Sequence, residues 1–197
     1  IKIDGVETQI GSPKQAKSDD IGMALIPEDR KTEGLMLPMS VRDNISIVSL
    51  DQLTKGLSVD RDKENQQIDE MVKKMAIKVG SLNDPVATLS GGNQQKVVIA
   101  KWLMTGARII LLNDPTRGID VGTKQELYQL FRELADAGNS IIYYSTDYDE
   151  LIGCCDRVKI FYAGKILKEL VGDEINETNI VASSLNIDLS GQERANA

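Results

Sequence analysis

Two short apolar segments on either side of an amphipathic segment constrain the fold of this chain more than any other feature. Residues 108–112 (RIILL) and 140–145 (SIIYYS) have the length and apolar content of strands buried on both faces of a sheet. Between them, residues 123–138 have helical periodicity, with one apolar face formed by Leu127, Leu130, Phe131 and Leu134. A strand, a helix and a strand in this order form a βαβ unit, so the sequence predicts an α/β fold with a parallel sheet.

Shorter elements are predicted on both sides of this unit. Antiparallel hairpins are expected over residues 1–10, around Asp4 and Gly5, and over 157–170. The other expected elements are a strand at 22–26 and helices over 60–78, 90–105 and 148–155. We therefore expect one domain over residues 1–175, followed by a polar tail over 176–197.

Composition excludes several classes of function. The chain has no histidine, which removes Ser-His-Asp and Cys-His catalysis and most zinc sites. Its formal net charge of −7 argues against a nucleic-acid partner, because phosphate backbones are bound by clustered Lys and Arg. No apolar run approaches the roughly 20 residues that span a bilayer. Cys154 and Cys155 are adjacent, which disfavours an unstrained disulfide and favours a reducing, cytoplasmic setting.

The stretch ATLSGGNQQKVVIAKWL, from Ala87 to Leu103, leads from two consecutive glycines directly into a helix. One interpretation is an ordinary helix start, with Ser90 as the cap and the glycines turning the chain. The other is an anion site, because glycine allows close backbone approach and a helix N-terminus offers unpaired N–H groups. On this stretch alone both interpretations stay open.

Polar residues follow two of the predicted strands. The strand at 108–112 is followed by Asn113 and Asp114. The strand at 140–145 ends at Ser145 and is followed by Thr146 and Asp147. In open parallel sheets, ligands bind at the carboxyl ends of the strands. A single Asp after a strand is more often a turn or cap residue, but two neighbouring strands that end in this way favour a site.

Three motifs in order make the chain resemble a known family. LSGGNQQ, an apolar strand ending in a DPTRGID string, and a strand ending in STD are together similar to the nucleotide-binding domain of an ATP-binding-cassette (ABC) transporter. PEDRKTEGL and TRGIDVGTK resemble the second, C-terminal cassette of the double-cassette ATPases of monosaccharide (ribose-, galactose- or xylose-type) importers. The resemblance extends from residue 1 to about residue 171. It implies a P-loop NTPase-like cassette with a parallel sheet core, an antiparallel β edge and a helical signature subdomain at about residues 40–90.

The resemblance also implies roles for individual residues. LSGG is the family's signature motif, so Ser90, Gly91 and Gly92 are expected to contact the γ-phosphate of ATP held by an opposite cassette, with Gln94 nearby. Asp120 resembles the aspartate of the loop that crosses between cassettes, although a helix cap is the alternative. The implied cofactors are ATP and Mg²⁺.

The chain departs from the family pattern in informative ways. It contains no G-x-x-x-x-G-K-[ST] phosphate cradle, which we expect in a preceding segment. Asn113 stands at the position of the Asp near magnesium, and the shorter Asp114 replaces the Glu that polarises the attacking water. Thr146 replaces the switch histidine, and Glu28 stands where a Gln usually lines the metal. The site on this cassette is therefore expected to be hydrolytically weak, and the chain alone inactive.

These observations predict the energy-coupling ATPase component of a carbohydrate importer. The expected partners are a second cassette, membrane permease subunits and, indirectly, a sugar-binding protein, and the expected location is the cytoplasmic face of the membrane. One alternative is a catalytically inactive regulatory cassette, which the changes at Asn113, Asp114 and Thr146 support. The other is a non-transport ABC protein that acts on ribosomes or DNA, against which the net charge of −7 counts.

Overall fold

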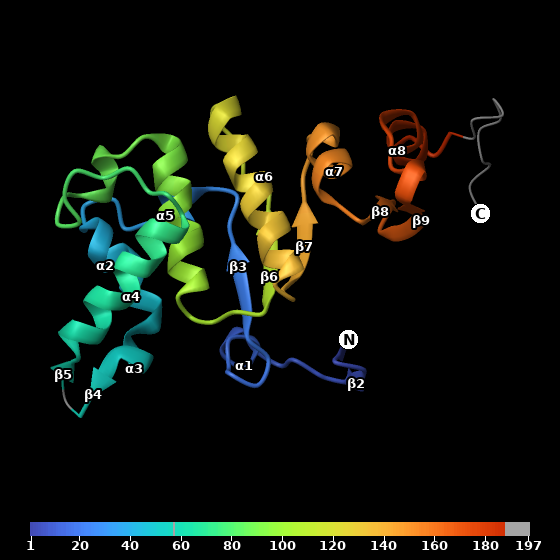
Figure 1. Cartoon of the computed structure of the whole chain (residues 1–197). Helices are drawn as coiled ribbons and strands as arrows, with labels where there is room; N and C mark the ends of the chain where they lie inside the picture. Colours follow the sequence, from blue (N-terminus) through green and yellow to red (C-terminus); the bar gives the residue numbers. More distant parts are fainter. Residues whose placement is uncertain (57, 188–197) are drawn as a thin grey trace. The chain divides into compact units, whose positions relative to one another are not determined.

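In the part of the chain that our computed structural model describes, residues 1–56 and 58–187, three parallel strands form the central sheet (Figure 1). Their order is β3 (Met23–Ile26), β6 (Ile109–Asn113) and β7 (Ser140–Tyr144). The long connection from β6 to β7 is the helix α6 (Val121–Asp136), so the βαβ unit and the parallel sheet are confirmed. The described chain divides into two compact units, Ile1–Tyr144 and a second that begins at Ser145.

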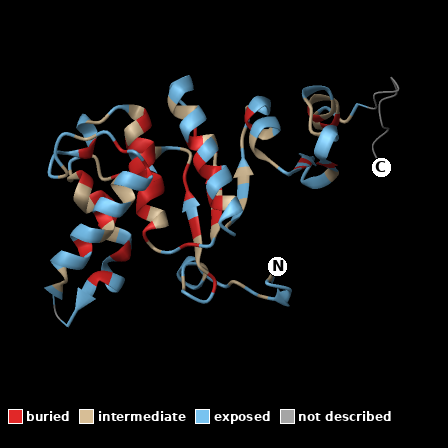
Figure 2. Ribbon diagram, viewed as in Figure 1, coloured by how far each residue is buried: buried red, intermediate tan, exposed pale blue. Residues whose placement is uncertain are grey.

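One face of the sheet is covered by helices α5 (Gly91–Leu103) and α6 (Figure 2). The strand residues on this face are buried, and they are Ala24, Ile26, Ile110 and Leu112. The apolar stripe of α6 packs in the same core, and the ring of Phe131 meets that of Tyr143 edge-on with centroids 5.8 Å apart. The helical periodicity read from residues 123–138 therefore identifies the face that packs on the sheet.

The opposite face of the sheet is open, which corrects the expectation that 140–145 is buried on both sides. Ile142 is 63% exposed, Tyr144 is 58% exposed and Leu25 of β3 is 51% exposed. Leu111 lies between Leu25 and Ile142 in the strand register, and it is half-buried. The apolar content of β7 correctly predicted a strand, but local sequence does not show whether a second layer covers it.

The rest of the first unit consists of a hairpin and a group of short helices. The hairpin, β1 (Lys2–Ile3) with β2 (Val6–Glu7), confirms the turn predicted at Asp4 and Gly5. The remaining elements are α1 (Pro13–Ala16), η1 (Arg30–Gly34), α2 (Val41–Ser46), η2 (Ile47–Ser49), α3 (Leu50–Leu53), β4 (Thr54–Lys55), β5 (Ser58–Val59), α4 (Arg61–Lys74) and η3 (Val86–Thr88).

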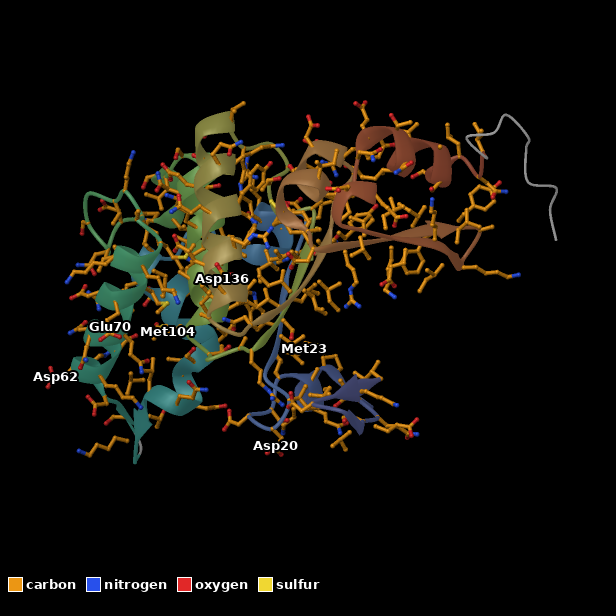
Figure 3. The ribbon with its side chains drawn as sticks, turned by 45° about the vertical axis from the view of Figure 1, so that its right-hand side comes forward. Asp20, Met23, Asp62, Glu70, Met104 and Asp136 are labelled. Atoms are coloured by element: carbon orange, nitrogen blue, oxygen red, sulfur yellow. The ribbon has the colours of Figure 1, made fainter. Side chains whose placement is uncertain are left out.

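Helix α4 is shorter than the predicted 60–78. It ends at Lys74, and Ala76 has a left-handed φ of 46°, a conformation that stops a helix but is unusual for alanine. Asp62 and Glu70 lie on its solvent-exposed side (Figure 3). Glu64 on the same helix is buried, and it accepts a hydrogen bond of 2.6 Å from Nη1 of Arg61.

The second unit has its own small core. Its elements are α7 (Tyr148–Cys154), β8 (Arg157–Tyr162), β9 (Lys165–Val171), η4 (Gly172–Glu174) and α8 (Glu177–Ser184). Strands β8 and β9 form the predicted hairpin, and Cys155 packs against the buried cluster of Val158, Ile160, Leu170 and Ile180. Helix α8 was missed, because the polar composition after Asn176 indicated a tail although Ile180 is buried. The last residues of the expected tail, 188–197, lie outside the described chain.

None of the helices in the described ranges is both long and apolar enough to cross a membrane.

Candidate functional site

The N-terminus of α5 is the centre of the candidate site. Ser90 caps the helix, because its Oγ accepts a hydrogen bond from the backbone N–H of Asn93 at 3.4 Å and from Asn93 Nδ2 at 3.0 Å. Ser90 itself is exposed, while the helix behind it is buried from Gln94 onward. An ordinary cap and a helix start near the surface therefore coexist here, with Gly91 half-buried and Gly92 buried, and the positive end of the helix dipole lies at this point.

The two glycines of the signature pack against different parts of the protein. A Cβ at Gly91 would lie 2.8 Å from Nη2 of Arg30, which approaches from η1. A Cβ at Gly92 would lie 2.7 Å from both Cγ2 and Oγ1 of Thr123 on α6. A side chain at Gly92 would clash with Thr123, and one at Gly91 would have to displace the guanidinium of Arg30, in addition to obstructing the close approach of an anion that the sequence suggested.

Gln94, which we expected near the ligand, points into the protein. It is buried, and its Nε2 donates hydrogen bonds to the carbonyl oxygens of Val86 at 3.4 Å and Leu89 at 3.2 Å. Its amide group therefore supports the loop that leads into the signature. A role of Gln94 toward a nucleotide stays a prediction.

Asn113 and Asp114 lie at the carboxyl end of β6, as predicted. Asn113 is the last residue of the strand and is paired with Tyr144 of β7. Asp114 is buried and has a left-handed φ of 47°, and its N–H donates to the carbonyl oxygen of Tyr144 at 2.9 Å. A non-glycine residue held in this region is a sign of a constrained turn, and such turns are concentrated at functional sites.

Glu28 follows β3 and reaches the same edge of the sheet. Its carboxylate forms an ion pair with the guanidinium of Arg117, which lies in the turn after Asp114. The next residue, Asp29, caps η1, since its Oδ1 accepts from the N–H groups of Lys31 at 2.8 Å and Thr32 at 3.3 Å. Hydrogen bonds from Thr32 and Lys31 hold the pKa of Asp29 below its usual range.

Arg30 is the residue of this site that sequence reasoning missed. An arginine in a charged loop is usually solvated, but the side chain of Arg30 is half-buried. Its Nη1 donates to the carbonyl oxygen of Arg117 at 3.1 Å, and Nη2 lies beside Gly91. Its Nε is buried and has no hydrogen-bond partner in the described structure. No local pattern could reveal these contacts, because Arg117 is 87 residues away in the sequence.

Asp120 is a helix cap in this structure. It precedes α6, with Oδ1 accepting from Thr123 N and Oδ2 from Thr123 Oγ1, both at 2.9 Å. These hydrogen bonds lower the pKa of Asp120. The cap does not test the predicted contact with a second cassette, which stays a prediction. Thr146 belongs to the second compact unit, where it stands just before α7.

The residues of this site fit a phosphate better than they fit a metal ion. A phosphate could accept hydrogen bonds from backbone N–H groups at the start of α5, and the guanidinium of Arg30 places a cation beside Gly91. Within the described ranges, no group of three His, Cys, Asp or Glu side chains could hold a metal. Glu28, a predicted metal ligand, is engaged by Arg117. Mg²⁺ is usually bound by one or two carboxylates together with phosphate oxygens, so the described side chains would act on it together with a nucleotide.

Comparison with known sequences identifies similar proteins. The family model described as "ABC transporter" matches residues 1–117. The chain is 67% identical over 187 residues to "Ribose import ATP-binding protein RbsA 1" of Mesorhizobium japonicum and 63% identical over 187 residues to the protein of that name from Rhizobium etli. These alignments cover 95% of this chain and 36% of each relative, so the chain spans about a third of their length.

Two solved structures show the same fold. A structure of cbiO1 from Clostridium perfringens, described as part of the ABC transporter complex cbiONQ, matches with a TM-score of 0.71 and 21% identity, covering 96% of this chain and 72% of that one. The dimeric, post-hydrolysis ATP-binding cassette MJ0796, bound to ADP and Pi, matches with a TM-score of 0.69 and 20% identity, covering 86% and 71%. The predicted α/β cassette fold is therefore confirmed.

Proposed function

Because this chain belongs to the ABC transporter family, we propose that it is the ATP-binding part of a carbohydrate importer. In this proposal the signature, Leu89–Asn93, completes an ATP site whose phosphate cradle belongs to a second cassette. The relatives at 67% and 63% identity, both named as ribose import ATP-binding proteins, support a sugar as the transported substrate. The dimeric state of the cassette MJ0796 supports a second cassette as the partner.

The observation that carries the proposal is the open N-terminus of α5. Helix α5, which is thirteen residues long, begins directly after the exposed Ser90. Gly91 has no side chain of its own that would obstruct access to the backbone. The N–H groups and the helix dipole stabilise negative charge at this point, which is the charge that a γ-phosphate carries. The side chain of Arg30 adds a cation next to the same point.

The strand-end residues support a weak hydrolytic site on this cassette. Asn113 provides no negative charge, and the carboxylate of Glu28 would have to leave Arg117 before it could approach a metal ion. Asp114 is held in a constrained backbone conformation and is shorter than glutamate. Together these features favour an asymmetric pair of cassettes, in which this chain serves mainly through its signature.

The remaining partners follow from the same function. ATP with Mg²⁺ is the proposed nucleotide, a membrane permease is the proposed docking partner, and a sugar-binding protein delivers the substrate to that permease. The proposed location is the cytoplasmic face of the membrane. The exposed residues of η1, Lys31, Thr32 and Glu33, lie next to the site and offer a surface for the permease.

The experiment that tests this proposal is a comparison of two variants in a complete importer. The matching region of the Mesorhizobium japonicum relative is replaced by this chain, and ATP hydrolysis and ribose uptake are measured. Gly91→Ala should reduce turnover by on the order of a hundredfold, as expected for the loss of one charge-stabilising contact of about 2–4 kcal/mol. Asp114→Asn should reduce turnover only a few-fold, since the strand end that carries Asp114 already lacks a negative charge at Asn113. Loss of turnover in Asp114→Asn with normal turnover in Gly91→Ala would contradict the asymmetric assignment.

A regulatory cassette without hydrolysis is the second candidate. The pairing of Glu28 with Arg117 and the absence of a carboxylate at Asn113 favour it. The same importer distinguishes the two, because a regulatory cassette would leave ATP hydrolysis unchanged in the Gly91→Ala variant while changing its dependence on sugar.

A further inference from the structure

We propose that Arg30 is a positioning residue for the signature, which fixes the N-terminus of α5 against η1 and against the turn at Arg117 and Gly118. This inference rests on the proposed function of the signature, and it assigns a role to a residue to which the resemblance gave none.

A single guanidinium group, carried by η1, lies against two other segments of the chain. Arg30 is the first residue of η1, and its Nη1 donates to the carbonyl oxygen of Arg117 at 3.1 Å. The same Nη1 lies 4.0 Å from the position that a Cβ of Gly118 would occupy. Nη2 lies 2.8 Å from the corresponding position at Gly91. The planar fork of arginine can make these contacts simultaneously, whereas lysine offers one point charge.

Because of the contact with Gly91, a side chain at the first signature glycine would compete with Arg30 for the same space. A Cβ would meet Nη2 well inside van der Waals distance, so a side chain there would displace the guanidinium. Because Nη2 is the end of a flexible side chain, we expect displacement of Arg30 rather than unfolding. The neighbouring Gly92 differs, since its Cβ would meet Cβ of Thr123 at 3.0 Å and Oγ1 at 2.7 Å.

The electrostatics also indicate a functional role for Arg30. A cation beside the N-terminus of a helix is repelled by the positive end of the dipole. In addition, Nε is buried without a partner among the described residues. The repulsion is unfavourable in the free chain and is relieved when an anion binds at the signature. Arg30 is therefore placed for the phosphate-bound state.

A second contact joins η1 to α5 further along the helix. The buried Nζ of Lys101 donates to the carbonyl oxygen of Gly34, the last residue of η1. A Cβ at Gly34 would meet Cγ2 of Val98 at 2.9 Å, so η1 and α5 pack closely here. Because η1 lies against α5 at Arg30 and is bonded to it at Gly34, a shift of η1 would disturb the start of α5. A partner that displaces the exposed side of η1 would thus move the signature.

The first test is a double-mutant cycle in the 197-residue chain, measured by urea denaturation. Arg30→Gln, Gly91→Ala and the double variant should be non-additive, with Gly91→Ala lowering the urea midpoint little or not at all once Arg30 is replaced. Gly92→Ala is the matched control, because its clash is with Thr123 and its shift should add to that of Arg30→Gln. Additive shifts for the Arg30 and Gly91 pair would overturn the proposed contact.

The second test uses the chimeric importer and separates positioning from general stability. Arg30→Gln and Arg30→Lys should each lower kcat about tenfold with less than about a twofold change in the KM for ATP, because the signature acts in the transition state. The double variant with Gly91→Ala should have the kcat of Gly91→Ala alone. Full ATPase activity of Arg30→Lys would show that a positive charge at this position is enough for turnover. It would overturn the proposal that the guanidinium positions the signature.

These outcomes are distinguishable from a failure of the proposed function. If the chimera without substitutions shows no ATP hydrolysis or ribose uptake, the importer assignment fails, while the urea cycle still tests the contact of Arg30 with Gly91. If the chimera is active and the cycle is additive, the importer assignment stands and the role of Arg30 is wrong.

Discussion

The backbone of Asp114 has a conformation that only a few residue types adopt without strain. Its φ of 47° lies in the left-handed region, where Gly, Asn and Asp are tolerated and β-branched residues are not. The sequence motif correctly placed this residue at the end of β6, but the motif did not indicate the strained turn. A residue with a longer side chain at this position, such as glutamate, would have to adopt the same left-handed backbone conformation.

Replacement of Asp114 tests this constraint directly. We expect Asp114→Asn to change the free energy of unfolding by less than about 0.5 kcal/mol, because asparagine tolerates the same conformation. Asp114→Val should destabilise the chain by about 1–2 kcal/mol or more, since a β-branched residue is strained there. Urea denaturation of both variants measures the difference. Equal stabilities would show that the turn relaxes.

Asn44 organises the loop before α2 through four hydrogen bonds. It is fully buried, its Oδ1 accepts from the N–H of Met36 at 2.8 Å, and its Nδ2 donates to the carbonyl oxygens of Met36, Met39 and Ser40 at 3.0–3.3 Å. We expect Asn44→Ala to destabilise the chain by on the order of 2 kcal/mol, because the backbone N–H of Met36 loses its acceptor and a fully buried side chain is removed. The exposed Asn83 provides the control, and Asn83→Ala should change the unfolding free energy by less than about 0.5 kcal/mol.

Among the elements, α5 and α6 are joined by an ion pair with unequal exposure. Nζ of Lys96 lies 2.5 Å from Oε2 of Glu126 and donates to the carbonyl oxygen of Ala76 at 3.2 Å. The Lys96 side chain is 5% exposed and that of Glu126 is 54% exposed. The hydrogen bond and charge of Lys96 lower the pKa of Glu126 below its usual value of 4.5. The pair therefore links the signature helix to the helix after the Asp114 turn.

This pair predicts a pH dependence of stability. Since the carboxylate binds its proton more weakly in the folded state, its contribution is present above the unfolded pKa and is lost as pH falls through the folded pKa. We expect the stability difference between the unmodified chain and Glu126→Gln to shrink as pH is lowered from about 6 to about 3. Glu70→Gln, which removes an exposed carboxylate paired with Gln66, is the control. If the stability difference between the unmodified chain and Glu126→Gln does not change with pH, the ion pair of Glu126 with Lys96 does not contribute in this way.

The elements also show which structural features can be predicted from local sequence. The stripe on α6 and the Asp4–Gly5 turn are local patterns, so the helix and the hairpin were predicted. The end of α4 was not, because the left-handed residue there is Ala76 and not glycine. The contact of Arg30 with Gly91 was missed for a different reason, since it joins segments that are distant in the sequence. Sequence motifs therefore predicted which backbone segments form the site. The side chains that pack against those segments depend on tertiary contacts, which the motifs do not show.

For the whole molecule, the exposed apolar face of the sheet is the feature with the clearest physical consequence. Leu25, Ile142 and Tyr144 are each more than half exposed, on strands β3 and β7. The other face of the same strands belongs to the main core. Contiguous exposed apolar surface of this kind favours association with another apolar surface.

We expect the chain to self-associate through this face. Ile142→Thr should reduce association, seen by analytical ultracentrifugation, and should change the unfolding free energy by less than about 0.5 kcal/mol. Ile141→Thr, one residue earlier and directed into the core, is the matched control and should destabilise by about 1–2 kcal/mol without removing the exposed patch. If Ile142→Thr associates as strongly as the unmodified chain, another surface mediates the association.

The open face also bears on the fate of the protein in a cell. Chaperones and quality-control proteases act on exposed apolar strands, and Leu25 and Ile142 present such strands in the folded chain. Capture of the chain would then require no unfolding of the core behind the sheet. The lifetime of this chain in a cell would then depend on how quickly further polypeptide covers this face, and mutations that strengthen the core would extend it little.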